Sequence, residues 1–81
     1  MARPPIHPGE ILAEELQERG IGAVQFAREA HIPHDQVSEI LAGKRSVTAD
    51  TAMRIGNWLG TGPEVWMNLQ SAYDLRSKVK S

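Results

Sequence analysis

The chain has 81 residues, with nine basic and ten acidic side chains and a formal net charge of −1. A chain of this length forms one domain around a modest core and has no room for a deep enzymatic pocket. The lack of cysteine excludes disulfides and thiolate metal sites, and no apolar run reaches a membrane-spanning length. We therefore expect a non-enzymatic, cytoplasmic protein without a signal peptide.

The spacing of apolar residues predicts five helices and no strand, which is an all-α fold. The first helix is predicted in the segment HPGEILAEELQERG. Pro8 suits the first helical position, acidic residues suit the positive end of the helix dipole, and Gly20 ends the helix. Its buried side is expected to consist of Ile11, Leu12 and Leu16.

Residues 23 to 42 have the pattern of a helix-turn-helix, with helices at about 23–30 and 34–42. Each helix has one apolar face to bury. These faces are formed by Val24 and Ala27 in the first helix and by Val37, Ile40 and Leu41 in the second. Ala27 is small enough for two helices to cross closely at a steep angle.

The break between these two helices falls at His31-Ile32-Pro33. Gly43 is expected to follow the second helix as its left-handed end residue. Lys44 and Arg45 come directly after it. A helix presented in this way can enter a DNA major groove with two cations beside the backbone.

Thr48 is expected to cap a fourth helix, which continues through Ala52, Ile55 and Leu59 to Gly60. The fifth helix is predicted at about 63–76, and residues 77–81 are expected to be frayed. Its apolar arc is wider than a small domain needs to cover its own core. The arc consists of Val65, Trp66, Leu69, Ala72 and Tyr73.

Four segments together resemble one family. They are HPGEIL near the start, ILAGKR after the helix-turn-helix, TADTAMRI, and GPEVWMNLQSAYDL. The chain resembles the HigA-type antitoxins, also called virulence-associated protein I, within the lambda-repressor-like helix-turn-helix group. The resemblance implies a compact five-helix protein that forms a homodimer, binds a palindromic DNA operator and represses its own operon. It also implies a partner, a RelE-like ribonuclease toxin of the HigB type.

The sequence departs from the family pattern at four positions. His31 replaces the usual glycine of the turn, so we expect it to adopt a positive φ. Gly22 replaces the usual capping Ser or Thr, and Ala42 stands where Asn is common. Ala23 stands where related repressors often place a Gln that contacts phosphate, so one backbone anchor is expected to be missing.

The resemblance also implies which residues face DNA. Those at the exposed start of the second helix of the motif would face base edges, and the two cations after it would contact phosphates or the groove. This set consists of His34, Asp35, Gln36, Ser38, Glu39, Lys44 and Arg45. Residues 21–50 sum to a charge of −1, so any DNA affinity has to come from a few well-placed contacts or from doubling in a dimer.

Two further surfaces are predicted. The dimer interface is assigned to the last helix, at Trp66, Leu69, Tyr73 and Leu75, with the first two packing mainly inside and the last two joining the subunits. An acidic row on the first helix is either a solvated face or a docking surface for a basic toxin. That row consists of Glu10, Glu14 and Glu18.

Metal binding and catalysis are not expected. Pro33 breaks the helical register between His31 and His34, and no carboxylate completes a ligand set with His7. We therefore predict no metal, no cofactor and no catalytic residue. Two alternatives to an antitoxin stay open: a stand-alone repressor of the same fold without a toxin, and a protein-binding adaptor that has lost its DNA affinity.

Overall fold

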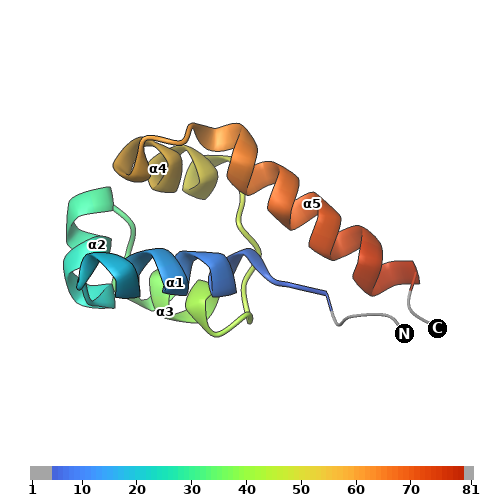
Figure 1. The fold of residues 1–81 in the computed structure, drawn as a ribbon, viewed down its shortest axis with the longest axis horizontal. Coiled ribbons are helices and arrows are strands. Elements are labelled where there is room, and N and C mark those ends of the chain that lie inside the picture. Colours follow the sequence, from blue (N-terminus) through green and yellow to red (C-terminus); the bar gives the residue numbers. More distant parts are fainter. Residues whose placement is uncertain (1–4, 80–81) are drawn as a thin grey trace.

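The computed structural model describes residues 5–79, which form five α-helices and no strand. The helices are α1 (Pro8–Arg19), α2 (Ala23–Ala30), α3 (His34–Leu41), α4 (Ala49–Leu59) and α5 (Pro63–Val79). The predicted all-α, five-helix fold is thereby confirmed. Figure 1 shows α1 and α3 below α4, with α2 at one end and α5 descending from α4 past the start of α1. No helix within residues 5–79 is both long and apolar enough to cross a lipid bilayer.

All five helices contribute to one core. Its largest fully buried side chains are Trp66, Phe26, Leu12, Ile40, Ile55 and Val37. Val24, which the apolar spacing predicted to be buried, is instead 58% exposed. The buried stripe of α2 is formed by Phe26, Ala27 and Ala30, so Phe26 and not Val24 packs beside Ala27 in the core.

The first turn of α1 is fixed by a capping box. The ring nitrogen Nδ1 of His7 accepts a hydrogen bond from the Gly9 N–H at 2.9 Å, and the Glu10 carboxylate accepts one from the His7 N–H at 3.2 Å. The His7 ring is buried and meets the Tyr73 ring edge to face, with 4.8 Å between centroids. A histidine thus caps α1 and links it to α5.

Gly9 lies where α1 touches the end of α3. A Cβ atom on Gly9 would overlap the carbonyl oxygen of Ile40 and would stand 2.8 Å from its carbonyl carbon. Only a residue without a side chain permits this approach of helix to helix. The position of α3 therefore depends on the first turn of α1.

The turn of the helix-turn-helix has the backbone that the sequence predicted. His31 has φ 63° and ψ 41°, and it is the only non-glycine residue with positive φ among residues 5–79. Its carbonyl oxygen accepts a hydrogen bond from the Arg54 guanidinium at 2.8 Å. Since Arg54 belongs to α4, this hydrogen bond ties the turn between α2 and α3 to α4.

His31→Gly is expected to raise the free energy of unfolding by about 0.5–1 kcal/mol. The left-handed conformation costs a non-glycine residue about 1–2 kcal/mol, and the greater chain entropy of unfolded glycine offsets part of this gain. Thermal unfolding followed by circular dichroism measures the change. As a control, Arg28→Gly one turn earlier in α2 should lower stability by about 1 kcal/mol, and a lower melting temperature for His31→Gly would contradict the assignment of strain.

The start and end of α4 also follow the prediction. The Thr48 hydroxyl accepts a hydrogen bond from the Thr51 N–H at 3.4 Å, and Gly60 ends the helix with φ 80°. Gly56 faces the chain that turns into α5, because a Cβ there would overlap the carbonyl oxygen of Gly62. A second close backbone contact thus holds α4 against the start of α5.

The predicted end of the last helix is wrong, because α5 continues to Val79. Residues 77 to 79, which were expected to be frayed, are helical, whereas residues 80 and 81 lie outside the described part of the chain. No glycine or proline interrupts the helix after Pro63. Arg76 and Lys78 in its last turn interact favourably with the negative end of the helix dipole.

Candidate nucleic-acid interface

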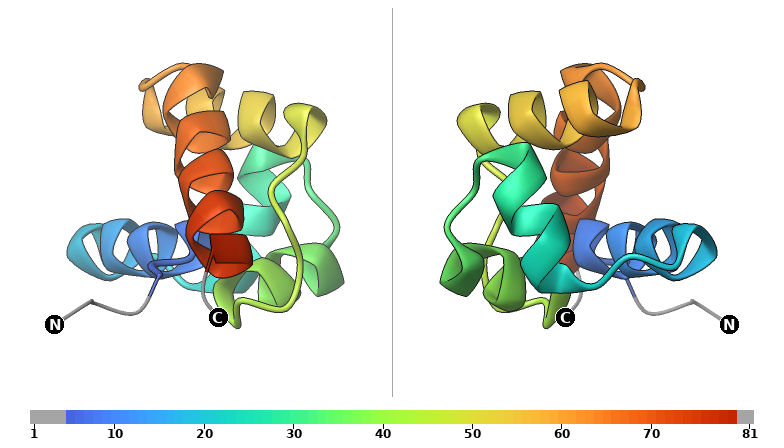
Figure 2. Two further views of the ribbon diagram at one scale, coloured as in Figure 1. Left: turned by 90° about the vertical axis from the view of Figure 1, so that its right-hand side faces the viewer. Right: turned by 90° about the vertical axis from the view of Figure 1, so that its left-hand side faces the viewer.

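Helix α3 presents one polar face away from the core. Val37 and Ile40 are buried, and the 3.6-residue period places Asp35, Ser38 and Glu39 on the side opposite to them. Figure 2 shows α3 at the lower edge of the molecule, where no other helix covers its outer side. The geometry suits a helix that enters a groove in DNA.

The end of α3 is a tight hydrogen-bonded turn. The Gly43 N–H donates to the Ile40 carbonyl at 3.0 Å, and the Lys44 N–H donates to the Glu39 carbonyl at 2.8 Å. Gly43 has φ 76°, so the predicted left-handed glycine is confirmed. The turn brings the chain back toward the helix, so that the Arg45 Nε lies 2.6 Å from Glu39 Oε1.

The structure brings the predicted DNA-facing residues together on α3 and the turn that follows it. Most of these side chains are exposed, whereas Gln36 and Glu39 are half-buried. The His34 ring nitrogen Nε2 lies 3.4 Å from the Ser38 hydroxyl. Sequence reasoning missed the ion pair between Glu39 and Arg45, because a helical pattern gives no information about a partner beyond the end of the helix.

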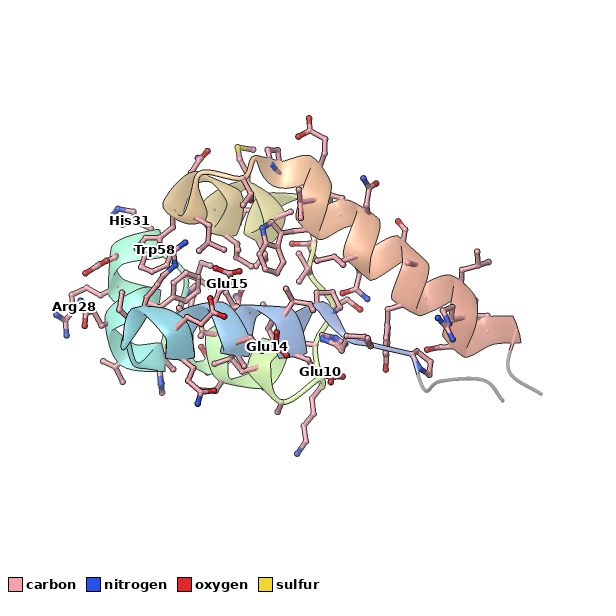
Figure 3. All side chains as sticks on the ribbon, viewed as in Figure 1. Glu10, Glu14, Glu15, Arg28, His31 and Trp58 are labelled. Atoms are coloured by element: carbon pink, nitrogen blue, oxygen red, sulfur yellow. The ribbon has the colours of Figure 1, made fainter. Side chains whose placement is uncertain are left out.

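The acidic row on α1 has two different parts. The Glu10 carboxylate is engaged in the cap of α1, whereas Glu14 and Glu18 are exposed further along the helix. Figure 3 shows Glu10 and Glu14 on α1, with Glu15 on the side nearer Trp58. Glu15 forms an ion pair with Arg19 at 3.5 Å, and the Arg19 guanidinium lies 5.6 Å from the centre of the Trp58 ring. Glu14 and Glu18 therefore remain as the acidic surface of α1.

A hollow of about 380 Å³ lies between α2 and α4. At its edge the Trp58 indole N–H donates to the Glu29 carboxylate at 2.8 Å, and the Gln25 amide donates to the same group at 2.9 Å. The hydrogen bond from Gln25 and then that from Trp58 lower the pKa of the Glu29 carboxyl. Because Glu29 and Trp58 are 29 positions apart, no local spacing in the sequence reveals this contact.

Only part of the predicted dimer surface on α5 is exposed enough for a second copy of the chain to contact it. Trp66 is 2% exposed and its indole N–H donates to the Thr61 hydroxyl at 3.0 Å. The prediction that Trp66 packs inside is confirmed, and because this ring is wholly part of the protomer's own core, it adds nothing to the surface that a second copy could cover. Leu69 and Tyr73 are half-buried, and Leu75 is 65% exposed.

The three histidines have separate structural surroundings. His7 is buried as the cap of α1, His31 forms the turn between α2 and α3, and His34 lies near Ser38. Within residues 5–79 no three His, Cys, Asp or Glu side chains are grouped as metal ligands.

No family model matches the sequence. Individual relatives do match: virulence-associated protein I of Dichelobacter nodosus is 43% identical over 74 residues, which are 90% of this chain and 68% of that protein. The solved structure of a HigA-family addiction module antidote protein from Coxiella burnetii superposes with a TM-score of 0.92 at 52% identity, covering 96% of this chain and 86% of that chain. The antitoxin HigA of Pseudomonas aeruginosa, solved with the higBA promoter, superposes with a TM-score of 0.88 at 41% identity, covering 91% of this chain and 82% of that chain. With this agreement in sequence, fold and helix-turn-helix, the chain belongs to the HigA family of helix-turn-helix antitoxins.

Proposed function

We propose that this protein is a dimeric antitoxin that binds operator DNA through α3 and represses its own operon in the cytoplasm. The proposal rests on the exposed polar face of α3. The turn at the end of this helix places Lys44 and Arg45 beside that face. The relative from Pseudomonas aeruginosa was solved with promoter DNA, which supports the same use of the fold here. We propose that residues 1–81 form one domain, which supplies both the reading helix and the dimer contact.

The DNA proposal is tested with a duplex from the region upstream of the protein's own reading frame. Gln36→Ala is expected to weaken binding to this duplex about tenfold. It should also reduce the sequence preference at one base position, because a Gln that pairs with adenine recognises only that base. Lys44→Ala should weaken operator and scrambled duplexes alike, because a phosphate contact carries no sequence information. Fluorescence anisotropy measures both, and if wild-type protein shows no preference for the upstream duplex at low salt, the proposal fails.

We place the dimer contact on the outer part of α5. Leu75 is 65% exposed and the half-buried Tyr73 lies two residues before it in α5, so the end of this helix offers apolar surface that a second copy can bury across a two-fold axis. Leu75→Glu is expected to give a folded monomer in sedimentation equilibrium. Met53→Glu, at a 51% exposed apolar residue of α4, should leave the dimer intact, and a wild-type monomer at micromolar concentration would contradict the interface.

The toxin proposal concerns a basic, RelE-like ribonuclease of the HigB type. A nuclease needs a basic surface to hold RNA, and the exposed carboxylates of Glu14 and Glu18 on α1 offer a complementary surface. Co-expression with the neighbouring reading frame, followed by affinity purification, should recover a stable complex. If no complex forms and the neighbouring product does not inhibit growth, the protein is a stand-alone repressor.

A further inference from the structure

We infer that Glu39 is a specificity-determining residue, which holds the Arg45 side chain and so weakens binding to DNA other than the operator. The inference rests on the proposed function of α3 as the reader of operator DNA. It assigns two linked roles to an acidic residue on the reading face: Glu39 restrains Arg45 in the free protein, and it accepts a hydrogen bond from a base on the operator.

Two interactions fix Glu39 to the segment after α3. Its carbonyl oxygen accepts the hydrogen bond from the Lys44 N–H at 2.8 Å, and its carboxylate Oε1 lies 2.6 Å from the Arg45 Nε. The left-handed Gly43 makes both possible, because it reverses the chain within the turn. The backbone of α3 therefore sets where the Arg45 guanidinium stands before any DNA arrives.

The ion pair contributes little to folding. The side chains of Arg45 and Glu39 are 44% and 46% exposed, and ion pairs at such exposure add little to stability because water and salt screen them. The packing of α3 instead depends on the buried Val37 and Ile40. Variants of Glu39 are thus expected to fold normally, which makes their DNA binding interpretable.

The pair changes how the reading face meets a phosphate backbone. Asp35 and Glu39 both lie on the side of α3 opposite to its buried residues, and Arg45 is already neutralised by one of them. While the Arg45 Nε stays on Glu39, the carboxylate offsets most of the attraction of the guanidinium for phosphate. If Arg45 turns away to give a phosphate its full charge, the released carboxylate repels the neighbouring phosphates.

Operator DNA can compensate for this penalty, whereas most other sequences cannot. A released Glu39 carboxylate can accept a hydrogen bond from a cytosine amino group in the major groove when the sequence supplies one at that position. On other sequences the carboxylate has no such donor. The cost of separating Glu39 from Arg45 is therefore larger on non-operator DNA, and this difference raises the ratio of operator to non-operator affinity.

The experiment measures binding of wild-type protein and Glu39→Gln to the upstream duplex and to a scrambled duplex of equal length and composition. Anisotropy titrations at several salt concentrations give affinities and salt slopes. Glu39→Gln is expected to tighten binding to the scrambled duplex by about three- to tenfold. It should also steepen the slope on that duplex by about 0.9 for each additional phosphate that a released Arg45 neutralises. The ratio of operator to scrambled affinity should fall.

Two controls separate this effect from net charge. Glu15→Gln on α1 removes an equal charge from the exposed pair that Glu15 forms with Arg19, and it should leave the salt slope unchanged. In an Arg45→Gln background, Glu39→Gln should no longer alter the slope. The inference is overturned if Glu39→Gln behaves like Glu15→Gln, or if its effect persists without Arg45. If wild-type protein does not prefer the upstream duplex, the proposed function fails, and the slopes on the scrambled duplex still decide whether Glu39 restrains Arg45.

Discussion

Gly9→Ala is expected to lower the free energy of unfolding by about 3 kcal/mol, although it adds only one methyl group to the first turn of a helix. The added Cβ would overlap the carbonyl oxygen of Ile40, and a backbone atom at the end of α3 cannot move aside as a flexible side chain can. Overpacking of this kind costs about 1–3 kcal/mol and sometimes more. Thermal unfolding by circular dichroism should show a fall in melting temperature of about 12–24 °C for a domain of this size.

Gly22→Ser is the matched control for this prediction. Gly22 precedes α2 with φ −83°, and a Cβ on it would meet no other atom within 4 Å. A serine there can also cap the free N–H groups of α2, so stability is expected to stay the same or to rise by a few tenths of a kcal/mol. If Gly9→Ala unfolds at the same temperature as the parent, α1 and α3 are not in the contact described here.

The same substitution also bears on DNA binding. Gly9 touches the last turn of α3, next to the segment that positions Lys44 and Arg45. Any Gly9→Ala protein that still folds at low temperature has to shift α3 relative to α1. Even at a temperature where this variant is fully folded, it should therefore bind operator DNA more weakly than the parent protein.

The sequence was sufficient to predict features that depend on local rules. The helix limits near Pro8, Gly20 and Thr48 were confirmed, because caps and glycine ends act within a few residues of each other. The positive φ of His31 was also confirmed, but this expectation came from the family resemblance, in which a glycine occupies this position of the turn. The position of α3 as an exposed helix also follows from local apolar spacing.

Contacts between distant parts of the chain could not be predicted in this way. Apolar spacing made Val24 a core residue, but the packing of α2 against the other helices selects Phe26. The roles of His7 and Gly9 depend on Tyr73 and Ile40, which are far away in the sequence. Local spacing contains no information about such partners. The HPGEIL segment could therefore be identified as a family motif, but the structural roles of its His7 and Gly9 could not be predicted.

The candidate site also combines features that follow from local sequence rules with contacts that do not. Which residues lie on the outer face of α3 follows from the helical period, whereas the pairing of Glu39 with Arg45 depends on how the turn at Gly43 folds back. On α5 the structure confirms that Trp66 packs inside the protomer, whereas the width of the apolar arc does not tell whether a second copy covers Tyr73 and Leu75.

Gln70 of α5 links this helix to the segment between α3 and α4. It is 4% exposed, and its side-chain oxygen accepts a hydrogen bond from the Val47 N–H at 2.8 Å. Val47 lies between α3 and α4, outside any helix, so its N–H takes a side chain of α5 as its acceptor. The Gln70 amide nitrogen in turn donates to the Asp74 carboxylate at 2.9 Å.

Gln70→Leu is expected to lower the free energy of unfolding by about 2 kcal/mol, despite its similar volume and greater hydrophobicity. The change leaves the buried Val47 N–H without an acceptor, and such a group costs about 1–3 kcal/mol. Urea unfolding measures the loss, and hydrogen exchange at Val47 should accelerate more than exchange in α2. Asp74→Ala removes only the outer, exposed partner and should cost less than about 1 kcal/mol. If Gln70→Leu is no less stable than Asp74→Ala, the hydrogen bond to Val47 does not hold α5 to this segment.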